Sequence, residues 1–215
     1  MAARGRSERS RRERRRAERP LVLIVVEGET EERYFADVKR RLRASWIRVE
    51  RPSRNDPRGL VLAARGMRDD LKREGLDVRP WVVFDAEARE NERARSYGEA
   101  MAQADKWGIG VANSSPCFEY WPLLHYSPGI IVESPAQAVA ELAKPGRAAG
   151  YRKPDLPHEE LWQAFMTGGP TSAAERRRET LAECGEDPRM GRPVTYVDRL
   201  MGSICGIAGI EPRSS

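Results

Sequence analysis

Acidic side chains come just after apolar segments at three places in this sequence. Glu27 follows the first such segment, and Glu31 stands about one helical turn further along. Asp85 and Glu87 follow another, and because residues i and i+2 of an extended segment point the same way, their two carboxylates can aim at one point. Glu119 follows a third segment through a short turn. If these segments are neighbouring parallel strands, the carboxylates meet beyond the carboxyl ends of the strands, where such sheets bind ligands.

Crowded carboxylates repel one another and stay ionised only when a cation neutralises them. Hard oxygen ligands of this kind suit Mg²⁺ or Mn²⁺. Such a metal stabilises the charge that develops on phosphate and activates water, so the pattern favours phosphoryl chemistry. The alternative is that these acids simply stand at helix starts, where the helix dipole favours them. That alternative is the better one for Glu29 and Glu32, whereas a functional role is favoured for Glu27 and Asp85, which directly cap buried strands.

The elements that must position these residues are short apolar strands alternating with helices. We expect strands at about residues 21–26, 47–50, 80–84 and 109–112, and helices at about 31–44, 58–73, 92–107 and 117–125. Thr30 is the expected N-cap of the first helix. Four strands alternating with helices predict an α/β fold with a mainly parallel sheet and helices on both faces. After residue 128, helices expected at about 134–143, 158–166, 172–183 and 194–206 predict a helical extension packed on the sheet.

Positive charge is concentrated at the N-terminus. The chain has 215 residues and a formal net charge of +5, but residues 1–19 contain nine Arg and three Glu, a net of +6. The other 196 residues carry 29 basic and 30 acidic side chains, a net of −1. Because residues 1–19 have almost no apolar side chains, we expect a disordered basic arm, then an α/β core at 20–128 and a helical extension at 129–215. The arm either contacts nucleic acid or is a solvated charge run, since Arg is frequent throughout the chain.

Several classes of protein are excluded by composition. No stretch approaches the roughly 18 apolar residues that cross a bilayer, and the Arg-rich start lacks the apolar region of a secretory signal. Three Cys without a CxxC pair argue against a disulfide framework or a cysteine zinc site. We therefore expect a soluble, cytoplasmic protein with no membrane partner. The Gly-Gly-Pro-Thr segment at 168–171 lacks the lysine of a P-loop, so ATP hydrolysis would need a partner protein.

Four motifs, taken in order, resemble known families. Glu-Gly at 27–28 and Asp-Ala-Glu at 85–87, each after an apolar strand, are similar to the E-G and D-x-D motifs of the Toprim pattern. The segment Ser-Pro-Cys-Phe-Glu-Tyr-Trp at 115–121, continuing into Leu-Leu-His-Tyr at 123–126, is similar to the S-N-P-C-F-E-L-W…L-L-H-F signature of RloB-like abortive-infection proteins. Tyr-Arg-Lys at 151–153 resembles the later Y-x-K of that family. The resemblance covers about residues 20–205.

This resemblance implies a Toprim-like domain and a Mg²⁺-dependent nuclease that acts on DNA or RNA. It implies a role as effector in a bacterial anti-phage system, often paired with an ATPase of the ABC/SMC type. Glu27 would be the general acid/base or a metal ligand, and Lys153 would stabilise the charge of the transition state. The implied metal ligands are Glu27, Glu31, Asp85, Glu87 and Glu119.

Two departures from the family patterns bear on the site. Glu87 stands in place of the second Asp, and Ser115 stands where the family has Asn. These departures favour an alternative, a non-catalytic Toprim-like partner that binds and regulates an ATPase. The neutral body would suit a second alternative, a metal-dependent phosphohydrolase acting on a small nucleotide, because a long duplex normally demands many phosphate contacts. The choice between DNA and RNA, between endo- and exonuclease, and between monomer and homo-oligomer stays open at this point.

Overall fold

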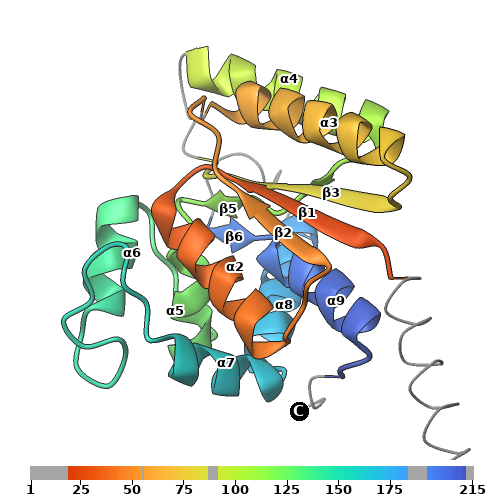
Figure 1. Ribbon diagram of the computed structural model, residues 1–215. Coiled ribbons are helices and arrows are strands. Elements are labelled where there is room, and N and C mark those ends of the chain that lie inside the picture. The colour runs from red at the N-terminus through yellow and green to blue at the C-terminus, as the bar shows by residue number, and fades with distance from the viewer. Residues whose placement is uncertain (1–18, 55, 87–91, 184–192, 212–215) are drawn as a thin grey trace, which may run out of the picture.

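The computed structural model describes residues 19–54, 56–86, 92–183 and 193–211. The predicted basic arm therefore lies almost wholly outside the described residues, and so does Glu87. The described chain forms a four-stranded sheet, covered on both faces by helices (Figure 1). Its strands are β1 (Leu21–Val26), β2 (Ile47–Glu50), β3 (Val78–Val83) and β4 (Gly110–Val111). They are all parallel, in the order β2-β1-β3-β4, which confirms the predicted α/β class.

Alternate side chains of β1 (Leu21–Val26) pack into two separate apolar cores, one on each face of the sheet. Leu23 and Val25 point to the face covered by α3 (Pro57–Arg73) and α4 (Glu92–Trp107), where they pack with Leu60. These two helices form the upper layer in Figure 1. Asp56 begins α3, because its side chain accepts a hydrogen bond from the Gly59 N–H, as an N-cap does.

The second face carries the larger core. Ile24 and Val26 of β1 belong to a cluster that also contains Trp121 and Phe165. The elements on this side, below the sheet in Figure 1, are α2 (Glu29–Arg41), α5 (Tyr120–Tyr126), α6 (Pro135–Leu142), α7 (His158–Met166), α8 (Gly169–Glu183) and α9 (Val197–Ala208). The C-terminal helical portion is thus packed beneath the sheet, as predicted. None of the helices among the described residues is long and apolar enough to cross a membrane.

Two predicted boundaries are wrong where the site is built. The first helix, α2, begins at Glu29 after Gly28, so Thr30 is a residue of the helix and not its cap. The helix expected at 117–125 begins only at Tyr120, which leaves Glu119 in the turn before it. In that turn the Phe118 N–H donates to the Asp85 carboxylate, so the segment is held across the sheet edge and does not continue a helix.

A short antiparallel pair was not expected. Strand β5 (Ser114–Ser115) pairs with β6 (Val194–Thr195), and the Ser114 and Thr195 hydroxyls are 2.8 Å apart. Because β5 precedes Glu119 and β6 precedes α9, this pairing holds the Glu119 segment next to the start of α9. Two-residue strands carry no periodicity, so the sequence could not indicate them.

Candidate acidic site at the carboxyl edge of the sheet

Four acidic side chains surround the carboxyl ends of β1 and β3. Glu27 follows β1 directly, Asp85 follows β3 by two residues, and Glu31 lies in the first turn of α2. Glu119 precedes α5 and is completely buried, while Glu31 is 5% exposed. The sequence prediction thus places these four residues correctly at one edge. Glu87, the fifth predicted carboxylate, lies outside the described residues.

Backbone hydrogen bonds tie three of the site segments together. The Asp85 N–H donates to Glu27 Oε2 at 2.9 Å, which joins the end of β1 to the end of β3. The Phe118 N–H donates to Asp85 Oδ1 at 2.7 Å, which joins β3 to the turn before α5. Both carboxylates are therefore oriented by main-chain donors, which move little compared with long side chains.

Gly28 leaves room for the Glu31 carboxylate. A Cβ atom at position 28 would lie 2.6 Å from Glu31 Oε2, closer than real Cβ contacts allow. The Glu31 side chain therefore folds back over the start of α2, where the helix N-terminus favours negative charge. The Glu-Gly pair at 27–28 thus has a steric reason, because any larger residue would push the neighbouring carboxylate away.

Burial and mutual repulsion perturb two of the carboxyl groups. Burial is the largest cause that raises the pKa of Glu31 from 4.5 to about 7, and repulsion from Glu119 and Glu27 adds to it. Burial also raises the pKa of Asp85 well above its usual value, with further increases from Glu31, Glu27 and Glu119. Glu31 and Asp85 therefore favour their protonated forms unless a counter-charge is present.

Two donors meet on one oxygen of Glu119. Lys153 Nζ lies 2.9 Å and the Tyr151 hydroxyl 3.1 Å from Glu119 Oε1. The Tyr151 hydroxyl is in turn hydrogen-bonded to the side chain of Thr30. Glu119 Oε2 is buried and has no hydrogen-bond partner among the described residues. A buried carboxylate oxygen without a donor is costly, so this oxygen is available to a ligand.

Lys153 brings positive charge to the edge of the site from a distant loop. Burial lowers its pKa, but the Glu119 carboxylate outweighs burial, so the pKa of Lys153 is raised overall. Its side chain is 49% exposed, so the ammonium group faces both Glu119 and solvent. The prediction that Lys153 belongs with the acidic residues is consistent with this position.

A comparison with protein-family models identifies the family of the chain. The model for RloB-like proteins matches residues 22–204. The chain belongs to the RloB-like family. The matched span contains every residue of the acidic site, and it confirms the resemblance to RloB-like proteins. The Toprim-like part of the resemblance stays a prediction. No curated protein and no solved structure shows significant similarity to the chain.

The carboxylates of the acidic site in this RloB-like protein are chemically suited to bind a hard divalent cation. The candidate ligands are carboxylate oxygens, two of the groups have raised pKa values, and no described residue donates a hydrogen bond to Glu119 Oε2. Across the described residues, however, no three Asp, Glu, His or Cys side chains are already arranged to hold a metal ion. A metal would therefore have to draw the carboxylates together.

The sequence did not reveal the roles of Tyr151 and Thr30. Thr30 was expected to cap a helix, and Tyr151 entered only as part of the Y-x-K motif. One signal was present, since residues i and i+2 of an extended segment share a side, which would place Tyr151 and Lys153 together. The partner of both, Glu119, could be identified only from the fold.

Proposed function

We propose that this RloB-like protein is a Toprim-type nuclease that hydrolyses phosphodiester bonds of DNA or RNA with Mg²⁺ or Mn²⁺. We further propose that it is the effector of a bacterial anti-phage system and works with an ATPase of the ABC/SMC type. The observation that best supports the nuclease is the group of four carboxyls at the sheet edge, where the buried Glu119 Oε2 has no hydrogen-bond partner within the described part of the chain. The proposed biological role depends on the family alone.

The proposed chemistry assigns a separate task to each side chain. Asp85, Glu31 and Glu119 would hold the metal, with Glu87 as a further predicted ligand. When bound, the metal supplies charge neutralisation at the phosphate. Glu27, oriented through the Asp85 N–H, would take a proton from the attacking water as its oxygen bonds to phosphorus.

Lys153 acts on the phosphate in this scheme. Its ammonium group has three N–H donors, and the one directed at Glu119 Oε1 leaves others for a phosphate oxygen. As the bond from phosphorus to the leaving sugar oxygen breaks, a proton from Lys153 or solvent neutralises that oxygen. The half-exposed side chain allows Lys153 to exchange protons with solvent afterwards.

A cleavage assay with three variants tests the proposal. Purified protein is incubated with plasmid DNA, single-stranded DNA and total tRNA, in EDTA, Mg²⁺ or Mn²⁺. We expect metal-dependent cleavage that is lost in Glu27→Gln and Asp85→Asn. Glu29→Gln is the matched control, because Glu29 is exposed, pairs with Arg33 and has the same side chain near the same strand end. Equal activity in wild type, Glu27→Gln and Asp85→Asn on every substrate would contradict the proposal.

A non-catalytic partner of an ATPase is the second candidate. Two observations favour it: no three described acidic, His or Cys side chains form a ready metal group, and Lys153 already neutralises Glu119. Under this candidate the protein neither binds Mn²⁺ nor cleaves nucleic acid, with or without the ATPase. Electron paramagnetic resonance of Mn²⁺, read as the fraction of free ion, separates the two functions before any substrate is known.

A further inference from the structure

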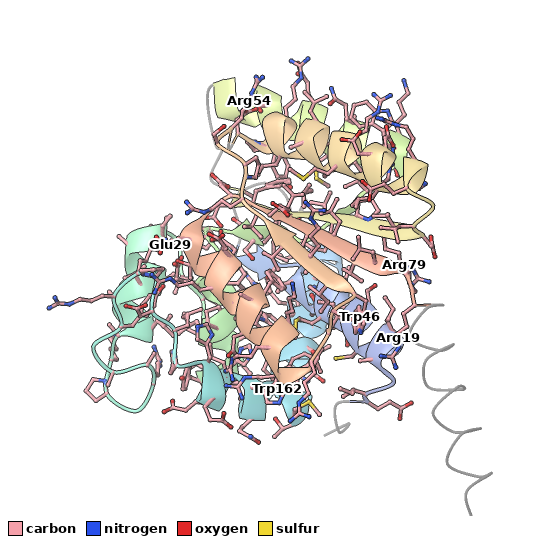
Figure 2. All side chains as sticks on the ribbon, viewed as in Figure 1. Arg19, Glu29, Trp46, Arg54, Arg79 and Trp162 are labelled. Atoms are coloured by element: carbon pink, nitrogen blue, oxygen red, sulfur yellow. The ribbon has the colours of Figure 1, made fainter. Side chains whose placement is uncertain are left out.

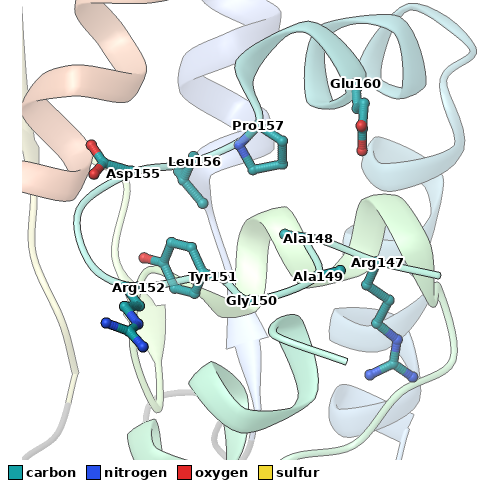
Figure 3. Close-up of a pocket in the computed structure, with 10 residues that line it drawn as sticks. All are labelled: Arg147, Ala148, Ala149, Gly150, Tyr151, Arg152, Asp155, Leu156, Pro157 and Glu160. Atoms are coloured by element: carbon teal, nitrogen blue, oxygen red, sulfur yellow. The ribbon is translucent and has the colours of Figure 1, made fainter. Parts of the chain in front are cut away.

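A hollow of about 560 Å³ lies beside the acidic site. Figure 3 shows its lining, which comes from the loop after α6 and from the start of α7. The lining residues are Arg147, Ala148, Ala149, Gly150, Tyr151, Arg152, Asp155, Leu156, Pro157 and Glu160. Tyr151 belongs to both places, because its hydroxyl reaches Glu119 while the residue lines the hollow. A ligand in the hollow is thus separated from the carboxylates by one side chain.

Most of the charges around the hollow are already paired. Arg147 donates to Glu141, Asp155 pairs with Arg33, and Glu160 accepts from Tyr126.

Arg152 differs from them, because its exposed guanidinium makes no ion pair or side-chain hydrogen bond with any described residue. It directly precedes Lys153 in the chain and adds this positive charge to the lining of the hollow.

The walls offer both a polar and an apolar contact. Ala148, Leu156 and Pro157 supply apolar surface, and Arg152 supplies the planar donor that suits a phosphate. A volume of this size lies within the range of small-ligand sites, roughly 300–1,000 Å³. One apolar wall for a base or sugar, next to one unpaired Arg, matches the chemistry of a nucleotide.

We propose that this hollow binds one nucleotide whose phosphate contacts Arg152 and whose base or sugar lies against Ala148, Leu156 and Pro157. The inference deepens the proposed nuclease function, since such a nucleotide would flank the phosphodiester group held at the carboxylates. The nucleotide belongs either to a single strand or to a free mononucleotide. A duplex is disfavoured, because its bases are stacked and the body outside residues 1–19 has a net charge of −1.

Two variants probe the hollow in different ways. Arg152→Ala removes the unpaired charge, and Ala149→Trp places a large side chain at an exposed position of the lining. Arg79→Ala is the matched control, because Arg79 is an exposed Arg on β3 at the far end of the sheet from Glu29 (Figure 2). Each full-length variant is first compared with wild type by its thermal unfolding midpoint.

Binding is measured by fluorescence anisotropy with labelled single-stranded DNA and RNA octamers, in EDTA and again with Ca²⁺, over a range of salt. We expect Arg152→Ala to weaken binding about ten-fold and to reduce the slope of log K against log salt by about 0.7, the value for one phosphate contact on a single strand. Ala149→Trp should weaken binding at every salt concentration with the slope unchanged. Arg79→Ala should leave both unchanged.

The outcomes separate this inference from the proposed function. Competition by 5′-AMP against the octamers identifies a site that takes a free nucleotide, and its absence identifies a site that needs the strand. Equal affinity and slope in wild type, Arg152→Ala and Ala149→Trp would overturn the inference, as would no binding of octamers or 5′-AMP by wild type. If cleavage is absent but Arg152→Ala still weakens binding, the nuclease proposal is wrong and the nucleotide site stands.

Discussion

Replacing Tyr151 by Phe removes one oxygen atom from the acidic site and keeps the ring. Burial, followed by the charge of Glu119, raises the pKa of Tyr151 well above its usual value, so the phenol keeps its proton. It therefore donates to Glu119 Oε1 at 3.1 Å throughout the working pH range. With Lys153 on the same oxygen, this donor helps direct Oε2 toward a ligand.

The expected effect of Tyr151→Phe has two parts. A hydrogen bond to a charged acceptor contributes about 1.5–3 kcal/mol, so the free energy of unfolding should fall by roughly that amount. Partners that orient a metal ligand typically change metal affinity about 10–100-fold, so the Kd for Mn²⁺ should rise by a factor in that range. Urea unfolding measures the first effect, and Mn²⁺ electron paramagnetic resonance measures the second.

Tyr126→Phe is the control for the loss of a hydroxyl. Tyr126 donates to the exposed Glu160 at 3.0 Å, outside the acidic site. This variant should lower stability by less than about 1 kcal/mol and leave Mn²⁺ affinity unchanged. If Tyr151→Phe binds Mn²⁺ as tightly as wild type, or if both variants weaken it equally, then Tyr151 does not orient Glu119.

Two further predictions concern Glu31. Gly28→Ala places a Cβ only 2.6 Å from the present position of Glu31 Oε2, so this variant should weaken Mn²⁺ binding by roughly ten-fold or more. Gly66→Ala is the control, because a Cβ at this helix position meets no other atom of the described residues. It should raise stability by about 0.5–1 kcal/mol and leave Mn²⁺ binding unchanged. Equal Mn²⁺ affinity in both Gly variants would show that the Glu31 carboxylate does not need this space. In EDTA, the pKa of Glu31 is raised from 4.5 to about 7 in the folded protein, so folding favours the protonated carboxyl. The stabilisation is fully present below pH 4.5 and is lost as the pH rises through 7, which lowers the free energy of unfolding by roughly 3 kcal/mol. In urea unfolding between pH 5 and 8, Glu31→Gln should not show this loss of stability. If the free energy of unfolding of wild type falls no more steeply with pH than that of Glu31→Gln, the reasoning is wrong.

The parallel sheet could be predicted because its signal is local. The run at Leu21–Val26 is apolar at every position, and the structure buries alternate residues in two different cores. Such a strand needs helices on both faces, and the helix patterns between the strands provide them. The carboxylates could be placed for the same reason, since Glu27 and Asp85 simply follow strands that end at one edge.

The second half of the site depends on contacts between distant segments. Tyr151 and Lys153 reach Glu119 from a loop 32 residues or more further along the chain, and no local pattern fixes the path of that loop. The start of α2 was misplaced because Thr30 is a common cap, whereas its side chain hydrogen-bonds to Tyr151. Local preference was overridden there by a tertiary contact.

The acidic site is unfavourable for the fold that contains it. Glu31 is buried and Asp85 is half-buried, and like charges add to desolvation in raising both pKa values. One oxygen of Glu119 has no hydrogen-bond donor among the described residues. An amide or apolar side chain at these positions would avoid that repulsion, so the requirements of folding do not explain the cluster. Local conflicts of this kind are typical of functional sites. A bound divalent cation would offset this repulsion, so the electrostatic cost of the cluster supports the metal site proposed above.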